Sequence, residues 1–284
     1  MIIWIASYPK SGNTWLRSLL ASYFYSKNGE FDFKLLEKIK QFPKVEDFIN
    51  DPDDYPTLES TSKNWISKQM EINNDQKLKF LKTHNAICNI NGNSFTDAKN
   101  SLGGIYIVRD PRNIITSIAN HYQININEAL EFMNNERRYL YQKIGTRFLA
   151  FSPLFSWSKH VESWTSCKLF PVLVVRYEDL HSATFQTFQK VINFIKDISK
   201  THISFDREKA KRSINSCDFD KLKNLEKKEG FKEAMIKKDK SGTISFFNLG
   251  QDNDYRKLLN TKILEKINNL YKDKLFELNY EKRN

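Results

Sequence analysis

The stretch that decides the fold is Tyr8-Pro9-Lys10-Ser11-Gly12-Asn13-Thr14-Trp15. Residues 2–5 before it are apolar, and the residues after it carry apolar side chains at helical spacing, which predicts a strand, a tight loop and a helix. Gly12 lets the backbone turn so that successive N–H groups converge on an anion, and the positive end of the helix adds to their field. Because Lys10 adds a charge and Ser11 and Thr14 add hydroxyl donors, the loop is predicted to hold a phosphate.

A second segment places a lysine and a histidine at the end of a predicted strand. Residues 78–83 read as a short strand that runs into Lys82-Thr83-His84. A neutral imidazole titrates near working pH, which suits a general base. The alternative is an ordinary surface histidine, since the chain contains five.

A third segment combines a buried strand with a capped helix. Residues 104–109 are apolar up to Arg109, and Asp110-Pro111 supplies an N-cap followed by proline at the first helical position. Ser117 then lies two turns into the helix. The planar guanidinium of Arg109 can bind phosphate oxygens in pairs, so Arg109 and Ser117 are predicted to share one phosphate, with solvated charges at a helix start as the alternative.

The octet does not follow the G-x-x-x-x-G-K-[ST] loop of ATPases and GTPases, because its lysine precedes its glycine. In their order and wording, the three segments instead resemble the sulfotransferases that use 3′-phosphoadenosine 5′-phosphosulfate (PAPS). The resemblance implies a P-loop-NTPase-like sulfotransferase fold over a single domain, residues 1–284. It also implies PAPS as co-substrate and a small-molecule acceptor. Because the sequence has no evident Walker-B aspartate or metal-binding cluster, we expect no metal requirement.

The resemblance further implies roles for individual residues. His84 would take the proton from a hydroxyl or amine of the acceptor, Lys10 would stabilise charge on the bridging oxygen, and Lys82 would stabilise charge on the sulfuryl group during in-line transfer. Arg109 and Ser117 would hold the 3′-phosphate. The implied nucleotide-binding residues are Lys10, Ser11, Gly12, Asn13, Thr14, Trp15, Arg109, Ser117, Tyr177, Cys217, Phe219, Asn248 and Gly250.

The chain departs from the family pattern where relatives grip the 3′-phosphate. Asn248-Leu249 replaces an Arg-Lys pair, so two cations are missing there. Either Arg109 and Arg112 suffice, or a nearby lysine substitutes, or affinity for the 3′-phosphate is reduced. The candidate lysines are Lys237, Lys238 and Lys240.

Two other function classes remain open at this point. A nucleoside or small-molecule kinase using ATP predicts metal dependence and a Gly-Lys pair, and the pair is missing. A catalytically silent nucleotide-binding protein gains some weight from the altered Asn248-Leu249. A panel of nucleotides read by thermal shift would separate these classes.

Composition sets the remaining expectations. The net charge of +11 suits an anionic cofactor, and no nucleic-acid-binding motif is present. Three cysteines without a pairing pattern argue against a disulfide framework or structural zinc. With no leader and no spanning apolar run, we expect a cytoplasmic protein without a membrane partner. The oligomeric state is left open, because the family's dimerisation stretch has lost its central pair at Asn260-Thr261.

Strands near residues 2–7, 78–83, 104–109 and 172–177 alternate with helical stretches, which predicts a parallel sheet covered by helices. Ligands of such sheets bind at the carboxyl ends of the strands. Three further segments are placed around this sheet. We expect residues 31–76 and 120–150 to form the acceptor wall, with irregular packing around the sheet as the alternative. We expect residues 221–240 to form a solvated lysine-rich helix followed by a lid. The aromatic residues of 156–164 are expected to be packing residues.

Overall fold

A computed structural model describes residues 1–48, 57–201 and 204–282 of the chain. Residues 49–56, part of the first expected acceptor segment, therefore lie outside the described residues. The described elements are, in chain order, β1 (Ile2–Ser7), α1 (Asn13–Tyr25), η1 (Phe33–Lys38), β2 (Lys40–Gln41), α2 (Val45–Phe48), α3 (Leu58–Lys63), α4 (Trp65–Asn73), β3 (Lys79–Thr83), β4 (Asn89–Ile90), β5 (Asn93–Ser94), β6 (Ser101–Val108), α5 (Pro111–Tyr122), α6 (Ile126–Asn134), β7 (Tyr139–Ile144), β8 (Arg147–Pro153), α7 (Trp157–Thr165), β9 (Val172–Arg176), α8 (Tyr177–Ser182), α9 (Thr184–Ser199), α10 (Arg207–Ser216), α11 (Phe219–Glu229), η2 (Gly250–Asp252), α12 (Tyr255–Leu258) and α13 (Thr261–Glu277).

The main sheet has five strands in the order β2-β3-β1-β6-β9, and every neighbouring pair is parallel. The four predicted strands are confirmed as β1, β3, β6 and β9, and the short β2 adds an edge that the sequence did not reveal. Near its carboxyl end β1 pairs Ala6 with Thr83 of β3 and with Tyr106 of β6. The three loops that follow these strands therefore leave one edge of the sheet side by side.

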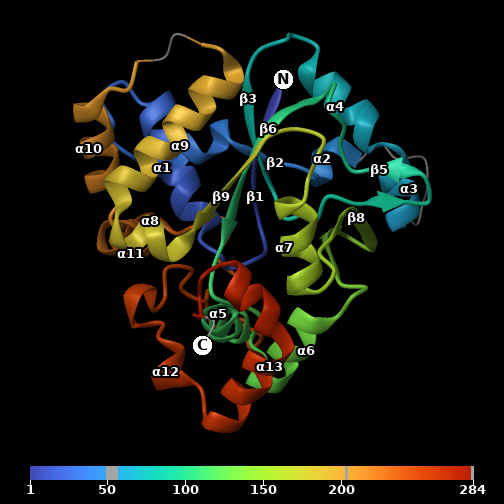
Figure 1. Cartoon of the computed structure of the whole chain (residues 1–284), viewed down its shortest axis with the longest axis vertical. Coiled ribbons are helices and arrows are strands. Elements are labelled where there is room, and N and C mark those ends of the chain that lie inside the picture. The colour runs from blue at the N-terminus through green and yellow to red at the C-terminus, as the bar shows by residue number, and fades with distance from the viewer. Residues whose placement is uncertain (49–56, 202–203, 283–284) are drawn as a thin grey trace.

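Both faces of the sheet are covered, as the apolar strands predict. Alternate residues of β1 enter different cores: Ile3 and Ile5 belong to the core that includes residues of α1 and α9, whereas Ile2 and Trp4 belong to the core that includes residues of α4 and α7. Figure 1 shows α1 and α9 on one side of the strands and α7 on the other. The single α/β domain with a central parallel sheet flanked by helices is thus confirmed.

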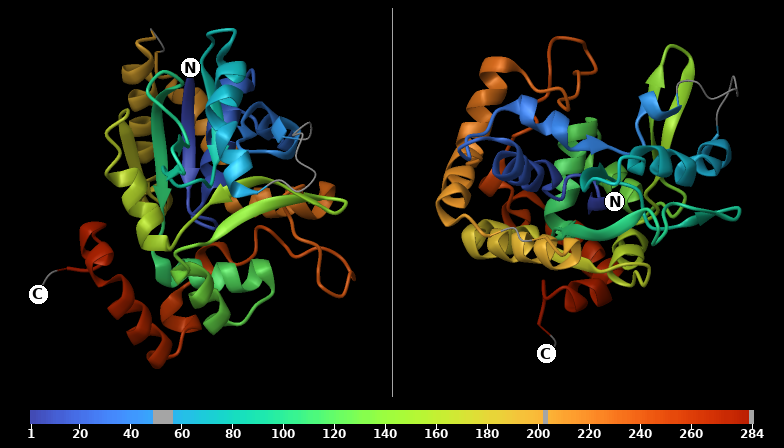
Figure 2. Two further views of the ribbon diagram at one scale, coloured as in Figure 1. Left: turned by 90° about the vertical axis from the view of Figure 1, so that its right-hand side faces the viewer. Right: turned by 90° about the horizontal axis from the view of Figure 1, so that it is seen from above.

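The elements added to this sheet gather around its carboxyl edge. In Figure 1 the strands run down towards α5 and α13, which lie below them. The left view of Figure 2 shows the β7–β8 hairpin, in yellow-green, and the loop after α11, in orange, extending from the same side of the molecule. Among the described strands β7 and β8 pair only with each other, as a separate two-stranded antiparallel sheet.

The start of α5 is the best-anchored turn at this edge. The Asp110 carboxylate caps the helix by accepting from the backbone N–H of Arg112, and it also pairs with the Arg112 guanidinium at 2.7 Å. Arg112 reaches on to Glu281 at 2.6 Å. Asp110 and Arg112 are both buried, so removing Arg112 would leave the Asp110 carboxylate without its charged partner, and removing Asp110 would leave the Arg112 guanidinium with Glu281 as its remaining charged partner.

Replacing Asp110 with Ala should therefore cost more than a lost cap. We expect a loss of about 3–5 kcal/mol in the free energy of unfolding, the usual effect of breaking a buried ion pair. Asp206→Ala is the matched control, since Asp206 caps α10 by accepting from the backbone N–H of Lys209, and it should cost about 1 kcal/mol. Urea unfolding of both variants makes the measurement. Equal losses would contradict the anchoring role of the pair.

Candidate active site

A cavity of about 760 Å³ opens at the carboxyl edge of the sheet. Its walls come from the loop after β1, the ends of β3 and β6, α5, the β7–β8 hairpin and the segment after α11. It is lined by most of the residues that the sequence singled out: Lys10, Gly12, Asn13, Thr14, Trp15, Lys82, His84, Arg109, Ser117, Tyr177, Phe219, Asn248 and Gly250.

The loop after β1 has the conformation that an anion site needs. Lys10 and Gly12 both have positive φ, at 67° and 97°, so the backbone turns sharply before α1 begins at Asn13. The side chain of Asn13 ties the loop to β1 by donating to the carbonyl of Ile5 at 3.0 Å. A Cβ on Gly12 would lie 2.5 Å from the Tyr177 ring, so only glycine fits this close approach.

Two predicted residues, Ser11 and Cys217, do not line the cavity. The Ser11 hydroxyl is buried and has no hydrogen-bond partner among the described residues, which is what a donor reserved for a ligand would show. Cys217 is buried in the core, and its backbone carbonyl accepts from the indole N–H of Trp15 at 3.0 Å. Cys217 therefore orients a cavity residue instead of facing the cavity itself.

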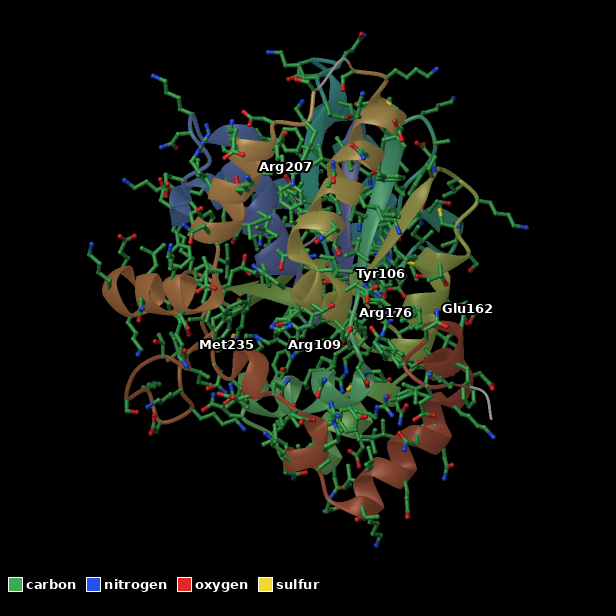
Figure 3. The ribbon with its side chains drawn as sticks, turned by 60° about the vertical axis from the view of Figure 1, so that its left-hand side comes forward. Tyr106, Arg109, Glu162, Arg176, Arg207 and Met235 are labelled. Atoms are coloured by element: carbon green, nitrogen blue, oxygen red, sulfur yellow. The ribbon has the colours of Figure 1, made fainter. Side chains whose placement is uncertain are left out.

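Arg109 and Ser117 come together as their spacing predicts. The Arg109 guanidinium lies over the Tyr177 ring, 4.3 Å from its centroid, and donates to the carbonyl of Lys10 at 3.2 Å. Its distance to the Ser117 hydroxyl is 3.5 Å. Figure 3 shows Arg109 just beyond the lower end of the sheet, between the strands and the helices below them. The Nε of Arg109 is buried without a partner among the described residues, which leaves a donor for a ligand.

The cations considered as substitutes for the missing Arg-Lys pair lie elsewhere. Arg112 is engaged by Asp110 and Glu281, and Lys238 donates to the carbonyl of Gln123 at 2.6 Å. None of Arg112, Lys237, Lys238 and Lys240 is among the described residues that line the cavity. Arg109 is therefore the one member of the proposed set that reaches it.

His84 is held in a defined tautomer. Its Nδ1 lies 2.7 Å from the backbone carbonyl of Ser7, which can only accept, so Nδ1 carries the proton and Nε2 keeps its lone pair. Burial, helped by the charge of Lys82, lowers the pKa of His84 to about 3. The ring is consequently neutral at working pH, in the form that can accept a proton.

A second histidine supports the first and was interpreted from sequence only as a packing residue. His160 is buried with Trp157 and Trp164, as expected. It also makes two hydrogen bonds: Nδ1 lies 2.9 Å from the Tyr106 hydroxyl, and Nε2 donates to the backbone carbonyl of His84 at 3.1 Å. The buried helix α7 thereby fixes the backbone that carries the proposed base.

Glu233 is the cavity residue that sequence reasoning missed. It follows α11, in the lysine-rich stretch that was expected to be a solvated helix and a lid, yet its carboxylate pairs with Lys82 at 3.0 Å and with Arg17 at 2.7 Å. Burial alone would raise the pKa of Glu233, but the charges of Lys82 and Arg17 hold it well below its usual range. Glu233 is one of four acidic residues among the lysines of 221–240, and no sequence pattern sets it apart from the other three.

Burial also lowers the pKa values of two lysines that line the cavity. Burial and the nearby charge of Arg109 lower the pKa of Lys10 from 10.5 to about 8. Burial also lowers the pKa of Lys82, with the Glu233 carboxylate acting in the opposite direction. Such shifts gather where a chain holds charged groups ready for chemistry or for binding an anion.

The two expected acceptor segments contribute unequally to the cavity wall. Within residues 31–76, only Gln41 of the described part lines the cavity. The segment 120–150 supplies seven lining residues, Asn120, His121, Tyr122, Leu140, Tyr141, Gln142 and Ala150. Polar and apolar side chains are mixed along this part of the wall.

Among residues 1–48, 57–201 and 204–282, no group of three or more His, Cys, Asp or Glu side chains is arranged to hold a metal ion. Within the same residues, no helix has the length and apolar character needed to cross a membrane.

Comparisons with known proteins agree with the geometry. The family model described as "Sulfotransferase domain" matches residues 2–279. Luciferin sulfotransferase of Photinus pyralis is 26% identical over 229 residues, which cover 75% of this chain and 58% of that protein. The aligned part thus spans less than two thirds of that relative's length.

Solved structures share the fold at low sequence identity. Retinol dehydratase in a complex with retinol and PAP has a TM-score of 0.60 at 16% identity, covering 97% of this chain and 81% of that one. Mouse sulfotransferase SULT7A1 complexed with PAP has a TM-score of 0.54 at 20% identity, covering 96% of this chain and 84% of that one. Since the family model spans nearly the whole chain, this chain belongs to the sulfotransferase domain family.

Proposed function

We propose that this chain transfers the sulfuryl group of PAPS to a hydroxyl or amine of a small acceptor. The observation that carries the proposal is the meeting, in one cavity, of an anion-binding loop, a histidine with a free Nε2, and an arginine–serine pair. Structural neighbours were solved with PAP, the expected product adenosine 3′,5′-bisphosphate. We also propose that the protein is located in the cytoplasm.

The residues present fit such a nucleotide. Ser11 and Arg109 each keep a buried polar atom with no partner among the described residues, and the backbone around Gly12 turns as an anion cradle does. The rings of Trp15 and Tyr177 pack edge to face, and Phe219 lines the same cavity next to Gly250. These aromatic faces are suited to a base, while Arg109 and Ser117 are suited to the 3′-phosphate.

PAPS supplies an activated sulfur atom whose bond to the bridging phosphate oxygen breaks as the new bond to the acceptor forms. The chain supplies the proton acceptor and the charge. His84 Nε2 takes the acceptor's proton. Lys10, at the turn of the loop, and Lys82, at the end of β3, stabilise negative charge on the oxygens. Catalysis would then rest on positioning and electrostatics.

Activity should depend strongly on His84. In His84→Gln, binding of adenosine 3′,5′-bisphosphate should persist, while PAPS-dependent turnover falls by roughly 10²–10⁴-fold, the usual effect of a positioned base. Turnover is measured with labelled PAPS and a cell metabolite extract, with the sulfated product identified by mass.

Lys10→Ala, which removes the charge of the loop, should abolish turnover. Near wild-type turnover in the Lys10 variant would end the sulfotransferase proposal.

Arg109 should carry the selectivity for the 3′-phosphate, because no other cation of the considered set reaches the cavity. A charge-assisted hydrogen bond is worth about 1.5–3 kcal/mol, so Arg109→Ala should weaken binding of adenosine 3′,5′-bisphosphate by roughly one to two orders of magnitude. Binding of AMP, which lacks the 3′-phosphate, should barely change. Calorimetric titration of both ligands measures this, with Arg256→Ala at an exposed site as control. A parallel loss for both ligands would move the 3′-phosphate site elsewhere.

The ring of His84 should stay neutral in acid. Because its pKa is lowered to about 3, the ligand-free protein at pH 5 should show a neutral imidazole with the proton on Nδ1, whereas an ordinary histidine would be mostly charged. Nitrogen chemical shifts of the ring, assigned by comparison with His84→Gln, report both properties. A resonance that titrates near 6.5 would contradict the burial argument.

A further inference from the structure

The role of Glu233 is not accounted for by the proposed transfer mechanism. The residue lies 151 positions after Lys82 in the sequence, yet its carboxylate is bound to the lysine that is proposed to face the sulfuryl group. Both carboxylate oxygens are engaged. Oε1 accepts from Arg17 at 2.7 Å, and Oε2 accepts from Lys82 at 3.0 Å and from the hydroxyl of Thr14 at 3.2 Å.

The carboxylate is anchored from behind. Arg17 is buried in α1, and its Nη2 donates to the backbone carbonyl of Ile39 at 3.2 Å, so the guanidinium has a fixed orientation. Arg17 does not line the cavity, so it contacts the carboxylate and not a ligand. A rigid fork of this kind holds a carboxylate in one place better than a flexible lysine does.

The segment that carries Glu233 is itself fastened to α11. The Glu226 carboxylate accepts from the backbone N–H groups of Phe246 at 2.6 Å and Phe247 at 3.0 Å, which closes the loop on its own start. Phe231 packs against both of these rings and against Phe33. Figure 3 labels Met235, two residues after Glu233, on the same loop.

We propose that Glu233 is a positioning residue for sulfuryl transfer: anchored by Arg17, its carboxylate holds the ammonium group of Lys82 in place and charged. The proposal rests on the function proposed above, because it gives Glu233 a task only if Lys82 acts on the reacting group. Lys82 has no other hydrogen-bond partner for its ammonium group among those recorded for the described residues. Without Glu233 its side chain would lose both its orientation and its nearest negative charge.

The surroundings of Lys82 make that charge matter. Besides Glu233, four ionisable groups interact electrostatically with Lys82: Lys10 of the loop, Arg17 of α1, His84 after β3 and His121 of α5. Each of these four groups is cationic or neutral. Burial already lowers the pKa of Lys82. Removing the carboxylate removes the attraction that keeps the ammonium protonated, so the lysine would lose its proton at a lower pH.

A competing reading makes Glu233 an internal substitute for the donor's anionic group. The hydroxyl of Thr14 and the ammonium of Lys82 meet at one oxygen of the carboxylate, as they would at an oxygen of the ligand. Under that reading, donor binding must expel Glu233, and removing its charge would tighten binding and raise turnover. The anchoring by Arg17 favours the positioning role, and the two readings predict opposite results.

Glu233→Gln tests the proposal, with Glu229→Gln, at the exposed end of α11, as the matched control. We expect kcat to fall by about 10- to 100-fold, the size of effect seen when a residue that orients a metal ligand is removed. Binding of adenosine 3′,5′-bisphosphate at pH 7 should not weaken. The alkaline limb of the pH profile of kcat should move down by about one pH unit. Glu233→Asp, which keeps the charge, should leave that limb close to its wild-type position.

Three results would overturn the proposal. Tighter product binding with a higher kcat/KM in Glu233→Gln would make the residue an internal competitor. An unchanged pH profile in Glu233→Gln, with parallel losses of Tm, binding and rate, would make the residue structural. If the Gln variant does not fold, Glu233→Ala, which also removes the charge, gives the same comparison. If Lys82→Ala stays active with PAPS, the role of Lys82 fails instead, which is a failure of the proposed function and is seen without any Glu233 variant.

Discussion

The pairing of β1 with β3 on one side and β6 on the other is the constraint on which the site depends. Parallel strands lie about 4.8 Å apart, so the loops that follow them begin within reach of one another. The hydrogen-bonded register places Ala6 beside both Thr83 and Tyr106. Residues that are about 75 and 100 positions apart in the chain thereby lie next to each other in the sheet.

Positive charge is concentrated at the carboxyl edge of the sheet. Lys10, Arg17, Lys82 and Arg109 are gathered there, and most of their surfaces are removed from water. Concentrating cations in this way is unfavourable by itself, which is why burial and mutual repulsion lower the pKa of Lys10. Glu233 offsets part of the excess charge. An anionic ligand would offset more of it, and would at the same time make the neutral His84 a stronger base by raising its pKa.

Local sequence patterns were sufficient to predict much of the fold and of the candidate site. The octet around Gly12 and the spacing of Arg109 and Ser117 each lie within one strand–loop–helix unit, and the tripeptide ending at His84 lies at the end of one strand, so the sequence itself brings the residues of each pattern together. The strands β1, β3, β6 and β9 were also found, because buried parallel strands are continuous apolar runs.

What the sequence could not reveal depends on distant contacts. The short β2 has too few residues for a pattern. Glu233 reaches Lys82 only because the loop after α11 folds back, and the second function of His160 exists only because α7 packs beside β6. The lysines at 237, 238 and 240 looked suitable by their charge, but charge alone does not say which way a loop faces. These features follow from the assembled fold.

The wall of the cavity formed by the β7–β8 hairpin has a consequence for how this chain can change over time. The hairpin makes its ladder hydrogen bonds within itself, not with the five-stranded sheet. Its side chains Leu140, Tyr141 and Gln142 nevertheless form part of the wall. New residues can therefore be tried in this hairpin without disturbing the strands that align the loop, the histidine and the arginine. Under the proposed function, substitutions in this hairpin would change which acceptor is bound, while the parallel strands keep the register that aligns the reacting groups.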